Sequence, residues 1–267
     1  GTVFTMNRDG SGYARLHSFA SDEGSNPENA PLVEGADGAL YGTCFSGGLT
    51  TAIFSAGMGT VFKLNKDGTT FTVLHRFTGT AGDGHHPSAA LVKGSDGVLY
   101  GTTSRGGTHD VGTVFKLNPD GTGYTILPGV ADTAGDGRVP WSKLVAGRNG
   151  ELYGTTFWGG TNDCGTVFKL NKDGTSYMVL HNFTFTTDTP QPNSLLIGSD
   201  GALYGTTTHG GANHAGSVFK LNQDGSGYIP GRAPAGQPLR DFDQQPAESR
   251  RHTDAEHDPG LHVKLED

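Results

Sequence analysis

The chain has 267 residues, including 44 glycines, only 33% hydrophobic residues and a formal net charge of −8 at pH 7. This acidic balance argues against nucleic acid and anionic membrane as partners, because both reward a basic surface, and no apolar run reaches the ~18 residues of a membrane span. The abundance of glycine predicts short strands and tight turns in an all-β domain.

One stretch of sequence recurs five times along the chain. Its copies are GTVFTMNRDGSGY from Gly1, GTVFKLNKDGTTF from Gly59, GTVFKLNPDGTGY from Gly112, GTVFKLNKDGTSY from Gly165 and GSVFKLNQDGSGY from Gly216. A second recurrent stretch, with the pattern Leu-Val/Leu-x-Gly-x-Asp/Asn-Gly-x-Leu-Tyr-Gly-Thr, begins at Leu32, Leu91, Leu144 and Leu195. A period of about fifty residues is typical of propellers and solenoids.

Each repeat predicts four strands in chain order: Leu-Val-x-Gly, Leu-Tyr-Gly-Thr, Thr-Val-Phe-Lys-Leu and Tyr-x-x-Leu-His-x-Phe. Asp-Gly or Asn-Gly turns join the first strand to the second and the third to the fourth, a strong hairpin signal. Four antiparallel strands make a propeller blade. We therefore predict an all-β fold, a β-propeller of four-stranded antiparallel blades that pack through the repeated Val, Phe, Leu and Tyr side chains.

The number of blades depends on the two ends of the repeat array. The sequence opens with only the last two strands of a blade, and the repeat ends after the first three strands of another blade, around Gly225. Either residues 1–19 complete the last sheet and these N-terminal strands close a ring of four blades, or they belong to a fifth, incomplete blade. A strand-swapped homodimer is a further way to pair the exposed edges.

The repeat ends near residue 228, and this predicts the domain organisation. Residues 229–267 have no period and are rich in Pro, Arg, Asp and Gln, a composition that does not bury enough apolar surface to fold. We predict a repeat domain over 1–228 and an irregular tail over 229–267. We interpret the tail as frameshifted or vector-derived sequence.

The variable loops share one face of the predicted blades, because the strands are antiparallel, and such loops are where a rigid scaffold carries function. Four acidic residues stand at similar places in the loops that lead from one repeat to the next: Asp22, Asp83, Asp136 and Asp188. If they converge they are predicted ligands for Ca2+, which prefers carboxylate oxygen. The alternative is that these aspartates only turn their loops.

The same loops supply candidates for catalysis and for substrate binding. His109 with Asp110, and His214 in the matching loop, are candidate general bases that would activate water, although His85, His86 and His209 also gather on this face. The third repeat contributes Trp141, Phe157 and Trp158, which are predicted to line a pocket for an apolar or sugar ligand. The alternatives are solvated histidines and a packed aromatic loop.

The repeated elements resemble the GloVer-type tandem repeat family of bacterial, often surface-anchored proteins, over residues 1 to about 228. The four-strand pattern is also similar to NHL-type and gluconolactonase-like propellers. The resemblance implies a propeller and a secreted or cell-surface bacterial location. In the wider group, Ca2+-dependent lactonases hold the ion at the propeller axis, but no motif here matches their ligands residue by residue.

Two hypotheses of function follow. The first, which we favour, is a Ca2+-dependent lactonase that opens the ester ring of a small lactone. An N-acyl-homoserine lactone would suit apolar loops beside a carboxylate ring, which would make the activity quorum quenching. The second is a non-enzymatic module that binds a glycan or a protein at the bacterial cell surface.

Overall fold

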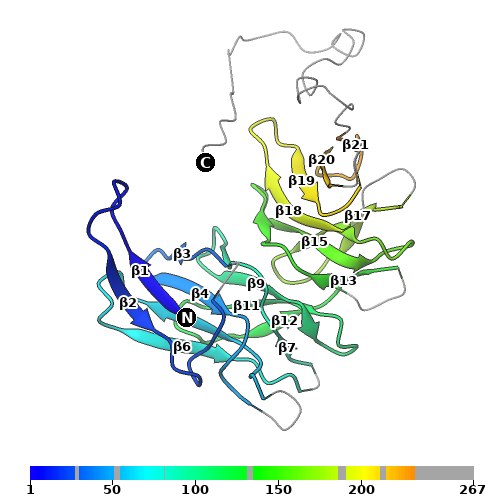
Figure 1. Ribbon diagram of the computed structural model, residues 1–267. Helices are drawn as coiled ribbons and strands as arrows, with labels where there is room; N and C mark the ends of the chain where they lie inside the picture. The colour runs from blue at the N-terminus through cyan, green and yellow to red at the C-terminus, as the bar shows by residue number, and fades with distance from the viewer. Residues whose placement is uncertain are drawn as a thin grey trace. The chain divides into compact units, whose positions relative to one another are not determined.

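The computed structural model describes residues 1–27, 30–50, 55–80, 82–130, 135–185, 191–210 and 215–231. Over these ranges the regular secondary structure consists of strands alone (Figure 1). Gly1–Arg232 forms one compact unit, and the predicted tail lies outside the described residues from position 232 onward. No helix of the described part is long and apolar enough to cross a membrane.

Four sheets each take their strands from one repeat, and neighbouring strands within them run antiparallel. The first contains β3 (Val33–Glu34), β4 (Leu40–Cys44), β5 (Thr60–Leu64) and β6 (Phe71–Arg76). The second contains β8 (Val92–Lys93), β9 (Leu99–Thr103), β11 (Thr113–Leu117) and β12 (Thr125–Leu127). The third contains β13 (Gly137–Pro140), β14 (Val145–Ala146), β15 (Glu151–Gly159), β16 (Thr166–Asn171) and β17 (Met178–Asn182). The fourth contains β18 (Pro192–Ile197), β19 (Leu203–Thr207), β20 (Ser217–Leu221) and β21 (Ile229–Pro230).

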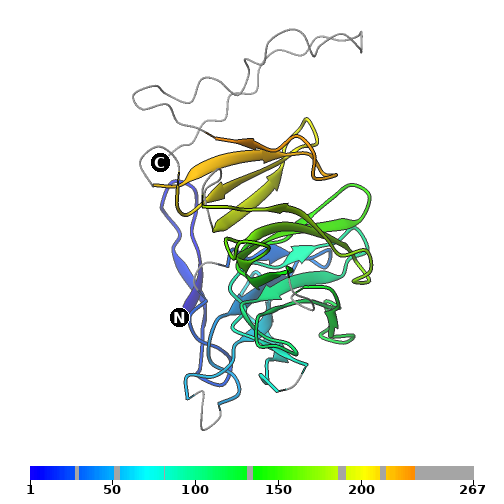
Figure 2. The ribbon, with the colours of Figure 1, turned by 90° about the vertical axis from the view of Figure 1, so that its right-hand side faces the viewer.

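Two smaller sheets have two strands each. One pairs β1 (Thr2–Thr5) with β2 (Ala14–Ser18), and the other pairs β7 (Gly84–His85) with β10 (Arg105–Gly106). The four large sheets follow one another in chain order, as the colour gradient in Figures 1 and 2 shows. The structure is thus an array of antiparallel sheets of the propeller type.

The register is the same in every repeat. The tyrosine of each Leu-Tyr-Gly-Thr strand stands opposite the lysine of the next strand, in the pairs Tyr41–Lys63, Tyr100–Lys116, Tyr153–Lys169 and Tyr204–Lys220. The turns are alike too: Asp67 accepts hydrogen bonds from the backbone N–H and hydroxyl of Thr69 at 3.0 and 2.7 Å. The predicted order of four strands and the turn role of Asp67 are confirmed.

Successive sheets pack by complementary faces. Between the first two large sheets, Tyr41 and Val61 from one side join Leu91, Leu99 and Phe115 from the other in a single buried cluster. The next interface repeats this arrangement one repeat further along the chain. Because alternate residues of a strand point to opposite faces, each sheet presents Tyr and Val to the following sheet and Leu and Phe to the preceding one. The predicted packing role of the repeated side chains is confirmed.

An aromatic stack joins neighbouring sheets at their outer strands. The ring of His75 lies 3.6 Å from that of Tyr124, centroid to centroid, and the His181 and Tyr228 rings are 3.7 Å apart. In the second repeat Pro128 stands in place of the histidine, and a Cβ on the next residue, Gly129, would come within 2.5 Å of Tyr177. The broken Leu-His-x-Phe pattern of that repeat therefore makes room for the neighbouring tyrosine.

Closure of a ring by the N-terminal strands is not confirmed. Among the described residues, β1 pairs only with β2, and the fourth position of the last sheet is filled by β21 of the same repeat. The sequence analysis expected the last repeat to end after its third strand. The short β21 supplies the fourth strand because Tyr228 stacks on His181 and so brings the chain back along β20.

We expect Phe115→Ala to lower the free energy of unfolding by about 3–5 kcal/mol, the usual cost of emptying a buried phenylalanine site. Phe115 is 0% exposed between two sheets. Lys116→Ala on the same strand is the control, because Lys116 is only half-buried. Urea denaturation measures both variants, and equal losses would contradict the packing assignment.

Candidate functional site

A cleft of about 510 Å³ opens among the variable loops of three successive repeats. Its walls include Phe45 from the first, His86, Arg105 and Asp110 from the second, and Arg138, Trp141 and Trp158 from the third. It thus brings together polar, charged and aromatic side chains on the loop side of the sheets.

A chain of hydrogen bonds leads from Asp110 through two histidines to this cleft. The Asp110 carboxylate lies 3.1 Å from Nε2 of His85, and Nδ1 of His85 lies 2.8 Å from Nδ1 of His86. A carboxylate only accepts, so His85 carries its proton on Nε2 and accepts through Nδ1. His86 then carries its proton on Nδ1, which assigns its remaining ring lone pair to Nε2.

The two histidines have different surroundings. His85 belongs to β7 and is 4% exposed, whereas His86 is half-buried and its ring stacks on Phe45 at 4.7 Å between centroids. Burial first, and then the neighbouring His85 and Arg105, lower the pKa of His86 below its ordinary value. The lowered pKa favours the neutral form of His86, the state in which an imidazole accepts a proton.

The backbone holds His86 in an unusual conformation. In each loop that leads into a new repeat, the residue before a proline has a left-handed φ, at Asn26 (53°), His86 (56°), Val139 (58°) and Gln191 (67°). The His86 N–H donates to the carbonyl of Met58 at 2.8 Å, and its carbonyl accepts from the N–H of Ser104 at 3.0 Å. Left-handed residues other than glycine cost energy, and because the repeats share this position, the repeat framework holds His86 in it.

The third repeat places an arginine where the second has its buried histidine. Arg138 donates to both oxygens of Asp163 at 2.6 Å. Asp163 also accepts from the N–H of Gly159 at 2.8 Å, as Asp110 does from Gly106. The two repeats therefore share one loop framework that carries different chemistry.

The three predicted aromatic residues do lie together. Trp141 and Trp158 are 39% and 37% exposed and line the cleft. The Phe157 ring lies 6.4 and 5.3 Å from their rings but is not part of the cleft lining. Tryptophan faces exposed to this extent offer apolar area to a ligand.

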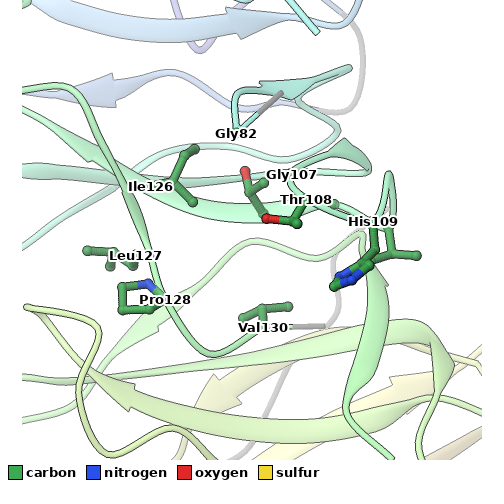
Figure 3. A pocket seen from close by; sticks show the side chains of 11 residues that line it. Gly82, Gly107, Thr108, His109, Ile126, Leu127, Pro128 and Val130 are labelled. Atoms are coloured by element: carbon green, nitrogen blue, oxygen red, sulfur yellow. The ribbon is translucent and has the colours of Figure 1, made fainter. Parts of the chain in front are cut away.

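The predicted catalytic residues are not all in one place. Asp110 lies in the cleft, but His109 lines a different cavity of about 250 Å³ beside Pro128 and Val130 (Figure 3). His214 lies outside the described residues. Among the loop histidines that could supply a general base, the prediction selected His109 and His214 and not His85 or His86. The available signal was the histidine directly before a proline, where the other repeats have Asn, Val or Gln.

The predicted calcium ligands do not converge in the part of the chain that the structure describes. Asp22 is exposed, Asp136 is half-buried, and Asp188 falls outside the described residues. Where the structure is described, no three His, Cys, Asp or Glu side chains form a group able to hold a metal. The described aspartates therefore do not fit a shared Ca2+ site.

Asp83 instead organises its own loop and joins it to the next repeat. Its carboxylate accepts from the N–H and hydroxyl of Thr78 at 2.7 and 2.8 Å and from the hydroxyl of Tyr124 at 2.5 Å. Burial opposes ionisation, but these donors and the nearby His75 outweigh it and hold the pKa of Asp83 well below its ordinary value. The lone pairs that would face a metal are already used.

The comparisons with known proteins agree with this architecture. The sequence pattern of the Gloeobacter/Verrucomicrobia repeat matches residues 1–147 and 112–233. The chain belongs to this repeat family. No match is found among curated proteins.

Solved structures similar to this chain share its fold at low identity. A chain of the nidogen/laminin complex is 15% identical with a TM-score of 0.51, covering 82% of this chain and 69% of that one. Streptogramin B lyase is 18% identical at 0.50, covering 79% and 56%. A gluconolactonase from Xanthomonas campestris is 16% identical at 0.50, covering 86% and 69%. At these identities the similarity shows the β-propeller fold alone.

We expect Asp83→Asn to lower the free energy of unfolding at pH 7 by about 1–3 kcal/mol, because buried donors lose a charged acceptor. The folded-state pKa of Asp83 is depressed. The stability that the ionised Asp83 contributes to the folded state is therefore complete above the unfolded-state pKa of about 3.9, and it is lost as the pH falls below that value.

Urea unfolding at pH 7 and at about pH 3 measures this difference between wild type and variant. It should shrink at the lower pH. Asp22→Asn is the control, since Asp22 is exposed, and it should change little at either pH. A gap for Asp83→Asn that stays constant with pH would contradict the assignment.

Proposed function

We propose that the family member described here is a hydrolase that opens the ester ring of a small lactone in the cleft beside His86. The observation that carries the proposal is the hydrogen-bonded series Asp110, His85 and His86, which ends at the cleft wall. A carboxylate that orients a histidine is the arrangement that prepares an imidazole to act as a base.

The reaction assigns one role to each member of the series. His86 takes a proton from water through Nε2 while the water oxygen attacks the lactone carbonyl carbon. The ring C–O bond then breaks, and the proton passes from His86 to the departing alkoxide, which leaves a hydroxy acid. His85 and Asp110 fix the tautomer of His86, and the negative charge of Asp110 favours the positive charge that develops on it.

The remaining walls suit a substrate with a polar ring and an apolar chain. Arg105 is exposed in the cleft, 3.9 Å from Asp110, and its guanidinium would stabilise negative charge on the carbonyl oxygen. Trp141 and Trp158 would cover an acyl chain. An N-acyl-homoserine lactone has both parts and is the substrate we propose to test first.

Ca2+ has no step in the proposed reaction, because Asp22, Asp83 and Asp136 do not form a common site in the described part of the chain. Whether the activity needs Ca2+ is a separate question. Hydrolysis of a lactone panel with added Ca2+ and then with chelator tests the point. Turnover lost on chelation would direct attention to Asp188, which lies outside the described residues.

A second candidate function is glycan or protein binding without chemistry. It is favoured by the two half-exposed tryptophans beside the Arg138–Asp163 ion pair. Exposed aromatic faces next to fixed polar groups are suited to the apolar and hydroxyl sides of a sugar. Binding without turnover would be unaffected by loss of the His86 base.

We expect His86→Gln to lower kcat/KM for the lactone by about 100-fold or more, the usual contribution of a general base. Because His86 must be neutral to accept a proton and its pKa is lowered, wild-type kcat/KM should stay on its plateau until the pH falls below about 6.5. The pH profile and the kinetics of the purified variant measure both effects.

Asn26→Gln is the matched control, because Asn26 occupies the same left-handed position before a proline in another repeat. Its turnover should equal that of the wild type. Unchanged kcat/KM in His86→Gln, with the fold intact by circular dichroism, would overturn the assignment of the base.

We expect Trp158→Ala to raise KM for long-chain lactones about tenfold while leaving short-chain lactones nearly unchanged. About 1.4 kcal/mol of apolar contact corresponds to that factor. Leu49→Ala is the control, because Leu49 is also exposed but is outside the cleft lining. Equal effects on both chain lengths would contradict the proposed acyl site.

A further inference from the structure

Within the described residues, β1 is paired along one edge, whereas the equivalent strands of the other repeats are paired along both. β5, β11, β16 and β20 carry the Thr/Ser-Val-Phe-Lys-Leu sequence and pair on both sides, with a Leu-Tyr-Gly-Thr strand on one of them. β1 begins with the same Thr-Val-Phe, but within the described residues it pairs with β2 alone. Such an edge presents backbone donors and acceptors that can bind another strand.

Two apolar side chains beside this edge are exposed where their counterparts are buried. Phe4 is 54% exposed, whereas the corresponding phenylalanines of the four large sheets are 0–1% exposed. Leu32 is 37% exposed, whereas Leu91 and Leu144 at the same place in later repeats are 0% and 1% exposed. A hollow of about 150 Å³ lies between Phe4 and Leu32.

The two-stranded sheet of β1 and β2 nevertheless packs against the sheet that follows it in the same way as the larger sheets do. Val3 is 6% exposed and packs with Phe62 and Leu64 of the following sheet, as Val61 packs with Phe115 and Leu117 one repeat later. β1 therefore stands where a complete sheet would place it. Among the described residues, what it lacks is a strand paired with its other edge.

The intact repeats show which chemistry fits that edge. In them the phenylalanine ring lies on a glycine: a Cβ on Gly42 would come within 2.5 Å of Phe62 Cζ. The neighbouring tyrosine packs on the leucines of the next sheet, as Tyr41 does on Leu91 and Leu99. An added strand thus needs a glycine opposite Phe4 and an aromatic residue next to it that reaches Leu32.

We propose that the edge of β1, flanked by Phe4 and Leu32, binds a β-hairpin of the chain's own repeat type, Leu-Val-x-Gly-x-Asp-Gly-x-Leu-Tyr-Gly-Thr. The hairpin adds two strands to β1 and β2 and so makes a sheet of four. Its glycine lies opposite Phe4, its tyrosine covers Leu32, and backbone hydrogen bonds supply the rest of the affinity. This inference does not depend on the proposed hydrolase activity.

A synthetic peptide with the sequence of residues 91–104, LVKGSDGVLYGTTS, tests the proposal on the whole chain. Calorimetry should show saturable binding of one peptide per chain. Hydrogen exchange should slow at residues 2–5 and not elsewhere. A peptide with Gly101→Val should bind at least tenfold more weakly, because its side chain would meet the Phe4 ring.

Protein variants complete the test. Phe4→Ser should weaken binding at least tenfold without lowering the melting temperature, since Phe4 is exposed. Phe185→Ser, at a residue 70% exposed in another repeat, should leave the affinity unchanged. No binding, equal binding of the Gly101→Val peptide, or a dimer that excludes the peptide would overturn the proposal, the last because a second copy would then cover the edge.

Discussion

The contact on which the sheets depend is that of a phenylalanine ring with a glycine on the neighbouring strand. At Gly42 a Cβ would lie 2.5 Å from Phe62 Cζ and 2.7 Å from a methyl of Leu32, and Gly154 has the same relation to Phe168 and Leu144. Any side chain there would push the ring off its own sheet and into the sheet before it. Because interiors are close-packed, the glycine fixes the spacing at which all other interface residues meet.

Because the strands and turns hold each sheet together, the loops between them can differ in sequence from one repeat to the next. The framework residues sit in strands and Asp-Gly turns, whose hydrogen bonds are the same in every repeat. Asp110 and Asp163 show how far the uniformity extends, since both accept the same backbone N–H in their loops. The partner on the other side changes from His85 to Arg138, so the chemistry changes while the backbone does not.

The part of the fold predictable from sequence is the part that depends on local pattern. Asp67 forms its turn through its own neighbours, and Tyr41 and Phe115 follow the alternation of a strand, so each could be assigned from spacing alone. The last strand could not be predicted in this way, because β21 consists only of Ile229 and Pro230 and is held by the contact of Tyr228 with His181. That contact joins residues far apart in sequence.

The site was harder to predict, for two physical reasons. An aspartate in a variable loop looks the same in the sequence whether it binds a metal or organises the loop. For Asp83 the difference lies in its hydrogen bond with the hydroxyl of Tyr124, which comes from the next repeat. The contact between the two histidines goes with a backbone conformation: at a left-handed φ of 56°, Nδ1 of His86 lies 2.8 Å from Nδ1 of His85. Sequence indicates the proline that follows but not this rotation.

The left-handed position before each proline explains how one repeat acquires chemistry that its neighbours lack. Val139 holds φ at 58° although a β-branched residue disfavours it, and a backbone hydrogen bond of 2.6 Å from its N–H to the Val111 carbonyl keeps it there. The conformation is thus imposed by the framework and not by the residue that occupies it. A site whose geometry is set in this way accepts Asn, His, Val or Gln without refolding. A single substitution can therefore place an imidazole on the cleft wall of one repeat and leave the other repeats to provide its apolar surroundings.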